Sequence, residues 1–293
     1  MVHWSGWRHA DVPIADAAGL GVEQNTLIRI ETANGTATVR AMVTDAISSG
    51  TVFVPIHWSG ENSSAARVGA LVHSAVDAIS GQPDLKATPA RVSPLEASCF
   101  GYFVTPSRAV PGALMSQDVV YWARTVVQNG YAYTFAIDGP AVLARQIADN
   151  LVPAEGRISF SDDAAGVYRS ANICGERVEA VVYLEPSPSV YPSAWLCSML
   201  LRSNLSAPER RALLAGEMPD GSVDTTPVIC VCNQVSSGRI ANAIAQGCRT
   251  SETVGKSCQA GTNCGSCIPE INRMLSLAVV SGCSGELQLA PAQ

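Results

Sequence analysis

Cysteines near the carboxyl end of the sequence are the side chains best suited to carry chemistry. Cys230 and Cys232 form a C-x-C pair, and after a gap of 31 residues Cys264 and Cys267 form a C-x-x-C pair. An extended segment places residues i and i+2 on the same face, so the C-x-C spacing sets two sulfur atoms side by side. Since thiolates are metal ligands, the two pairs together predict a four-cysteine metal centre.

An iron–sulfur cluster and a zinc ion are the two candidates for this centre. Gly265 lets backbone amides approach the sulfur atoms, and a helix starting after the C-x-x-C pair would direct its positive end at them. Zinc ribbons more often use two C-x-x-C pairs, so the tighter first spacing favours iron–sulfur, while a four-cysteine zinc module stays open as the alternative. No histidine follows His73, which excludes mixed cysteine–histidine zinc fingers and Rieske centres here.

Length and composition limit the classes of protein to consider. The chain has 293 residues, of which 47% are hydrophobic and 15% charged, enough for about two domains and a small third. Its formal net charge of -6 argues against a nucleic acid partner. No apolar stretch approaches the ~18 residues of a membrane span, and no secretory signal is visible at Met1, so we expect a cytoplasmic protein without membrane contact.

The first part of the sequence predicts a small β structure. A β-branched run over residues 26–32 is followed by the turn dipeptide Asn34-Gly35 and by an alternating segment, residues 36–43. Such a pattern is typical of a β-hairpin. A third strand is expected over residues 51–56, and three short strands with tight connections suggest a small barrel.

The rest of the chain predicts a mixed region and then a helical module. Between Leu95 and Pro227 we expect strands over 131–135 and 178–183 and helices over 141–150 and 207–215, and residues 216–226 resemble a linker. Beyond this linker, caps and apolar spacing predict three short helices, beginning near Ser236, Thr250 and Pro269. So small a module gains much from a metal centre.

These cysteine pairs also carry a resemblance to a known family. The run from Cys230 to Cys232, the run from Gly261 to Glu270 and the gap between them resemble the bacterioferritin-associated-ferredoxin-like 2Fe-2S domain. The same domain ends bacterial assimilatory nitrate reductases. The resemblance implies a 2Fe-2S cluster with four ligands: Cys230, Cys232, Cys264 and Cys267.

The first part of the chain is similar to another domain of the same reductases. Residues 15–22, 50–60 and 76–92 resemble their molybdopterin-dinucleotide-binding domain, a double-psi β-barrel. The resemblance implies that molybdopterin guanine dinucleotide contacts three residues: His57, Trp58 and Lys86. Residues 118–124 and 208–216 are similar to the segment that joins the barrel to the cluster domain in this family.

The resemblance implies the C-terminal part of a molybdenum nitrate reductase. In this family an N-terminal four-cysteine motif binds a 4Fe-4S cluster and large central domains carry molybdenum, and the sequence contains neither. We therefore expect an oxidoreductase portion that is not catalytic alone and contains no catalytic residue. Its partners would be the missing molybdenum domains or subunit and an electron-donating reductase or ferredoxin. The alternative is a free-standing electron-transfer or docking module.

The expected fold class is multidomain α+β. The division along the chain is a double-psi barrel, truncated at its N-terminus, over residues 1–95, a mixed α/β connecting region with linker over 96–226, an all-helical 2Fe-2S domain over 227–283, and a tail over 284–293.

Overall fold

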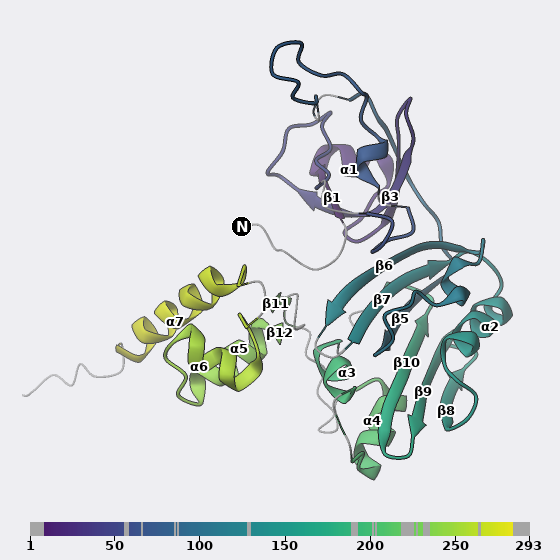
Figure 1. Ribbon diagram of the computed structural model, residues 1–293, viewed down its shortest axis with the longest axis vertical. Helices are drawn as coiled ribbons and strands as arrows, with labels where there is room; N and C mark the ends of the chain where they lie inside the picture. The colour runs from purple at the N-terminus through teal and green to yellow at the C-terminus, as the bar shows by residue number, and fades with distance from the viewer. Residues whose placement is uncertain are drawn as a thin grey trace, which may run out of the picture.

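The computed structural model contains three folding units joined in chain order (Figure 1). It describes residues 9–55, 59–65, 67–84, 86, 88–127, 130–188, 193–200, 202, 204–217, 226, 228–230, 235–262 and 265–283. Each unit combines strands with helices, so the multidomain mixed α and β composition expected from the sequence is observed.

A four-stranded mixed sheet forms the first unit. Its strands have the order β1-β3-β2-β4, with β1 parallel to β3 and the other pairs antiparallel. The elements are β1 (His9–Pro13), α1 (Ile14–Leu20), β2 (Leu27–Glu31), β3 (Thr36–Thr44), the 3-10 helix η1 (Val68–Ala70) and β4 (Arg91–Pro94).

The predicted hairpin of this unit is confirmed, and its third strand is shorter than predicted. Glu31 pairs with Thr36 across the Asn34-Gly35 turn. Between residues 51 and 55, only Phe53 pairs, in an isolated antiparallel bridge to Asp11. Pro55 has no backbone N–H to donate, so it cannot extend this ladder. Buried aliphatic side chains of β1, β2 and β3 form the core of the unit, among them Val12, Ile28 and Val39.

The middle unit is a six-stranded antiparallel sheet with helices on both faces (Figure 1). Its strands have the order β6-β7-β5-β10-β9-β8. The elements are β5 (Cys99–Thr105), the 3-10 helix η2 (Gly112–Met115), β6 (Val119–Val127), β7 (Gly130–Ile137), α2 (Ala141–Leu151), β8 (Arg157–Asp162), β9 (Val167–Cys174), β10 (Arg177–Glu185), α3 (Ser193–Met199) and α4 (Ala207–Ala215).

Alternation along the strands gives the middle sheet two cores. Phe103 faces the core that contains α2, whereas its neighbour Tyr102 faces the core that contains α3 and α4. Side chains alternate between the two faces of a strand, so a sheet covered on both faces buries both sets. The predicted helices over 141–150 and 207–215 are α2 and α4, and the predicted strands lie within β7 and β10.

Direct contacts join the first unit to the middle sheet. The Ser64 N–H donates to the Trp122 carbonyl at 3.0 Å, and the Arg124 N–H donates to the Asn62 carbonyl at 2.8 Å. The buried Arg40 guanidinium lies over the rings of Phe100 and Tyr121, at 5.9 and 5.6 Å from the ring centroids. A cation on aromatic faces in a buried contact stabilises this junction.

The C-terminal module consists of three helices and one short antiparallel strand pair. Its elements are β11 (Val228–Cys230), β12 (Val235–Ser236), α5 (Ser237–Ala245), α6 (Ser251–Cys258) and α7 (Ile268–Cys283). Ser236 Oγ and Thr250 Oγ1 cap α5 and α6, as their positions in the sequence predict. The strand pair is an addition to the all-helical architecture expected from the sequence.

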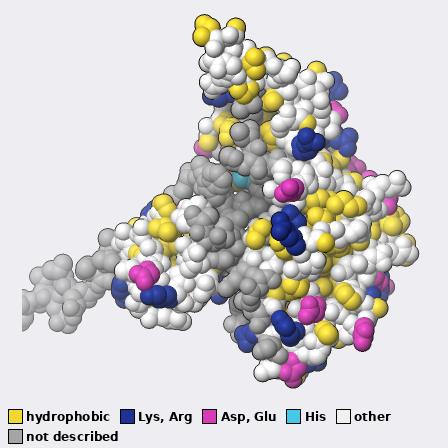
Figure 2. All heavy atoms as spheres, viewed as in Figure 1, with side chains coloured by type: hydrophobic (Ala, Val, Ile, Leu, Met, Phe, Trp, Pro, Cys, Tyr) yellow, Lys and Arg dark blue, Asp and Glu magenta, His cyan; other side chains and the backbone are white. Residues whose placement is uncertain are grey.

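Charged side chains and helix length can be followed over the described part of the chain. On the coloured part of the face in Figure 2, basic and acidic side chains are scattered, and no large basic patch forms. Every helix in the described parts of the chain is too short or too polar to cross a membrane.

Candidate metal centre

Cys230 and Cys267, 37 positions apart in the sequence, meet in the core of the C-terminal module. Cys230 ends β11 and pairs with Val235 of β12, and Cys267 immediately precedes α7. The two residues are 2% and 6% exposed, and both belong to the same hydrophobic cluster. The structure therefore brings together one cysteine from each predicted ligand pair.

The surroundings of Cys267 combine burial with a backbone hydrogen bond. Burial raises the pKa of the Cys267 thiol to about 12, and the neighbouring Cys230 contributes to this increase. The backbone of Gly261 acts in the opposite direction and lowers the pKa of this thiol. A metal that binds here must displace protons, and the backbone of Gly261 would then help to stabilise the resulting thiolate.

Two helix N-termini lie beside these cysteines. The Ile271 N–H donates to the Cys267 carbonyl at 3.0 Å, so Cys267 occupies the capping position of α7. The start of α5 directly follows β12, whose residues pair with the strand that ends at Cys230. Helix N-termini carry partial positive charge, which favours an anionic centre at this position.

The loop before α7 takes a conformation that its glycines permit. Gly261 and Gly265 have φ angles of +81° and +74°, values that side chains with a Cβ rarely adopt. The Ile268 N–H donates to the Gly265 carbonyl at 3.0 Å and closes the turn that leads into the helix. This turn presents Cys267 to the module core.

The other two predicted ligands, Cys232 and Cys264, lie outside the described residues. Among the described residues alone, no three potential ligands form a metal site.

Two further cysteines of the module hydrogen bond to backbone carbonyls. Cys258 is buried in the same core, and its Sγ–H donates to the Val254 carbonyl at 3.3 Å. Cys248 is partly buried and donates to the Thr253 carbonyl at 3.4 Å. Both thiols therefore interact with the backbone of α6.

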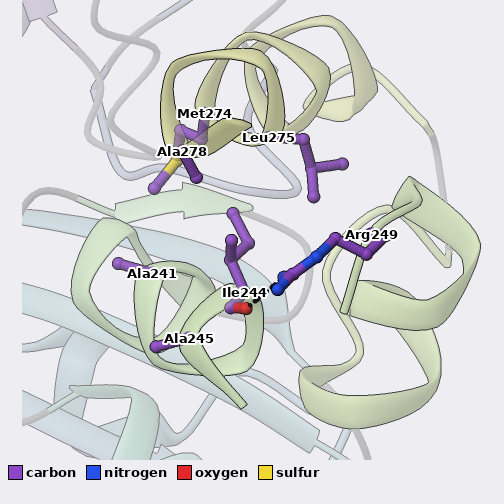
Figure 3. A pocket seen from close by; sticks show the side chains of 7 residues that line it. All are labelled: Ala241, Ile244, Ala245, Arg249, Met274, Leu275 and Ala278. Carbon is purple, nitrogen blue, oxygen red and sulfur yellow. Dashed lines mark hydrogen bonds between the residues drawn. The ribbon is translucent and has the colours of Figure 1, made fainter. Parts of the chain in front are cut away.

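An apolar groove of about 290 Å³ opens between α5 and α7 (Figure 3). Its lining residues are Ala241, Ile244, Ala245, Arg249, Met274, Leu275 and Ala278. Arg249 points across the groove, and its Nη1 donates to the Ile244 carbonyl at 2.7 Å and to the Cys248 carbonyl at 3.1 Å. The Arg249 charge therefore caps the C-terminal end of α5.

Of the three residues predicted to contact the pterin, the structure describes only Lys86. His57 and Trp58 lie outside the described residues. Lys86 is exposed, its backbone N–H donates to Asp84 Oδ1 at 3.1 Å, and no described carboxylate lies within ion-pair distance of its ammonium group. An exposed cation without an ion pair suits a phosphate-bearing ligand.

Family models match both ends of the chain. The molybdopterin dinucleotide binding domain matches residues 8–89, and the BFD-like [2Fe-2S] binding domain matches residues 228–276. The two matching domains are named for the two cofactors expected from the sequence, molybdopterin dinucleotide and a 2Fe-2S cluster.

Similarity to nitrate reductases extends over most of the chain. It is 28% identical to a nitrate reductase of Klebsiella oxytoca over 92% of this chain and 31% of that protein. It is 35% identical to the assimilatory nitrate reductase catalytic subunit of Bacillus subtilis over 27% of this chain and 11% of that protein. A Synechocystis nitrate reductase is 41% identical over 21% of this chain and 8% of that protein. The chain spans less than a third of the length of these relatives, and the resemblance is to part of an oxidoreductase.

Proposed function

We propose that this chain, which carries the molybdopterin dinucleotide and [2Fe-2S] binding domains of nitrate reductases, is the C-terminal portion of such an enzyme, acting in nitrate assimilation. Reduction of nitrate to nitrite and water consumes two electrons and two protons. A 2Fe-2S cluster in the C-terminal module would accept electrons one at a time and supply them to molybdenum carried by domains outside this chain.

The burial of Cys230 and Cys267 in one hydrophobic cluster carries this proposal. Cys267 precedes α7, and Cys230 pairs with the strand that leads into α5, so backbone amides and helix dipoles would favour a negatively charged centre here. Cys232 and Cys264 would complete the ligand set from their places in the two pairs. Four cysteines with such surroundings fit a 2Fe-2S cluster.

The first unit would enclose one side of molybdopterin guanine dinucleotide. We propose His57, Trp58 and Lys86 as contacts, with the exposed ammonium group of Lys86 as a phosphate or pterin partner. A double-psi barrel is proposed for this unit. The parallel pairing of β1 with β3 within an otherwise antiparallel sheet supports it.

The remaining parts of the proposal concern domains and partners. The division at residues 95, 226 and 283 is supported by the matched ranges, which fall inside the first and third parts. The proposed partners are the molybdenum-carrying domains or subunit and an electron-donating reductase or ferredoxin. We place the enzyme in the cytoplasm, in keeping with the assimilatory relative.

Anaerobic reconstitution of the full chain with iron and sulfide tests the cluster. We expect a coloured protein with two irons per chain and an electron paramagnetic resonance signal on one-electron reduction. Cys264→Ser should lose the colour, whereas Cys174→Ser, at an exposed position on the end of β9, should keep it. A colourless protein with one tightly bound zinc per chain would establish the zinc alternative instead.

A further inference from the structure

The groove between α5 and α7 opens onto the core of the C-terminal module (Figure 3). Two of its lining residues, Ile244 and Leu275, belong to the buried hydrophobic cluster of this module. Met274 is half-buried, and Ala241 and Ala278 are exposed. An apolar segment that filled the groove would therefore extend the module core and remove apolar surface from water.

The α7 wall of the groove offers apolar side chains one helical turn apart. Met274 and Ala278 both line the groove, and residues i and i+4 of a helix are separated by about 6 Å along its axis. The helix ends at Cys283, about 7.5 Å beyond Ala278. A segment that turned back at the end of α7 would therefore pass Ala278 first and Met274 second.

Residues 284–293, which follow α7, have a sequence suited to this path. Gly285 stands two positions after the last residue of α7, where glycine commonly reverses the chain at the end of a helix. Leu287 and Leu289 follow it. In an extended segment residues i and i+2 project from the same face, about 6.6 Å apart, and this repeat matches the helical repeat along the α7 wall.

Chain length brings the two leucines to the two apolar positions of α7. An extended chain advances about 3.3 Å per residue, which sets how far each residue after Gly285 can return along the helix. Leu287 would come level with Ala278. Leu289 would come level with Met274, one helical turn further along.

We propose that residues 284–293 fold back along α7 and occupy the groove, with Leu287 and Leu289 inserted between α5 and α7. The charges are complementary, because Arg249 is the one charged side chain among the described lining residues and Glu286 is the one charged side chain of the segment. With a cluster loaded, the segment would also slow cluster release by covering the module core, and this consequence alone rests on the proposed function.

Hydrogen–deuterium exchange of the full chain tests this inference. We expect the backbone amides of residues 286–290 to exchange about tenfold more slowly than those of a free peptide of the same sequence. The double substitution L287S/L289S should abolish this protection, because it removes the apolar side chains that fill the groove. Gln288→Ser is the matched control and should keep the protection, since its side chain would project from the opposite face of the segment.

Ala241→Glu tests the contact from the side of the groove. Ala241 is exposed on α5, so the helix should tolerate the substitution, but a carboxylate in the apolar groove should expel residues 286–290 and abolish their protection. Asn242→Glu adds the same charge at the next position of α5, which is also exposed, and should leave the protection unchanged.

Three results would overturn the inference. The first is exchange of residues 286–290 in the original chain as fast as in the free peptide. The second is protection that remains in both L287S/L289S and Ala241→Glu. The third is protection that is lost when the protein is diluted, because the groove would then be filled by a second copy of the chain.

Discussion

The two cofactor regions differ in how their predicted binding residues relate to the hydrophobic core. In the C-terminal module, Cys230 and Cys267 are themselves core residues, packed with Ile240, Val254 and Ile271. In the first unit, the core is made by strands β1 to β3, and Lys86 is exposed. A cluster held by core residues would contribute to the folding free energy of the module. The pterin would instead bind to a unit whose core forms without it.

The C-terminal module and the first unit also differ in size and in the units that they pack against. The module is small, and a core of so few side chains gains stability from a metal centre. The first unit instead gains a second core, where Leu27 packs with Tyr121 and other residues of the middle sheet. Its stability is shared with a larger neighbour.

Removing the cluster should have the largest effect. Chelation of iron, or Cys267→Ser, should unfold the module, because structural metal centres contribute on the order of 10 kcal/mol to folding in small domains. Circular dichroism should show loss of helix, and limited proteolysis should cut within residues 228–283 while the six-stranded sheet survives. An equally stable module without metal would contradict the comparison.

The second largest effect should come from truncating a core side chain, and it should differ between the two regions. Ile240→Ala, at a fully buried position of α5, should cost about 2–5 kcal/mol. We expect this loss to appear as a lower cluster content and faster cluster release. Ile28→Ala is the control in β2, also fully buried, and should lower the thermal stability of the first unit without changing the cluster spectrum.

Arg40→Met should weaken the junction of the first unit with the middle sheet. It removes the cation over Phe100 and Tyr121 and the donor to the Asn25 carbonyl, at a cost of about 1–3 kcal/mol. Calorimetry should show that the first unit unfolds at a lower temperature. Arg29→Met, at an exposed position of β2, should leave the unfolding temperature unchanged. Equal effects of the two substitutions would contradict a stabilising role of Arg40 at the junction.

Lys86→Ala should have the smallest effect on stability, within about 0.5 kcal/mol, because the side chain is exposed. Binding of the molybdopterin dinucleotide should nevertheless weaken, since a cation available to phosphate is lost. Thermal unfolding and dinucleotide content measure the two quantities. If Lys86→Ala destabilised the first unit as much as Ile28→Ala, Lys86 would be part of the core, and the difference between the two cofactor regions would not hold.

Local signals predicted most elements of the module and the hairpin of the first unit. Caps at Ser236 and Thr250 and the turn Asn34-Gly35 act over a few residues, so they can be recognised in the sequence. The strand order of the middle sheet and the single bridge at Phe53 could not be predicted, because they depend on pairings between distant segments.

The sequence by itself determined the donor chemistry: two cysteine pairs, their spacings and the glycines that allow the turn before Cys267. These are local properties, fixed by residue type and by a few backbone angles. Only the tertiary structure decided that Cys230 and Cys267 share one buried cluster, because α5, α6 and α7 pack around common apolar side chains and so bring together residues 37 positions apart. The same packing buried both thiols and left Cys267 at the N-terminus of α7.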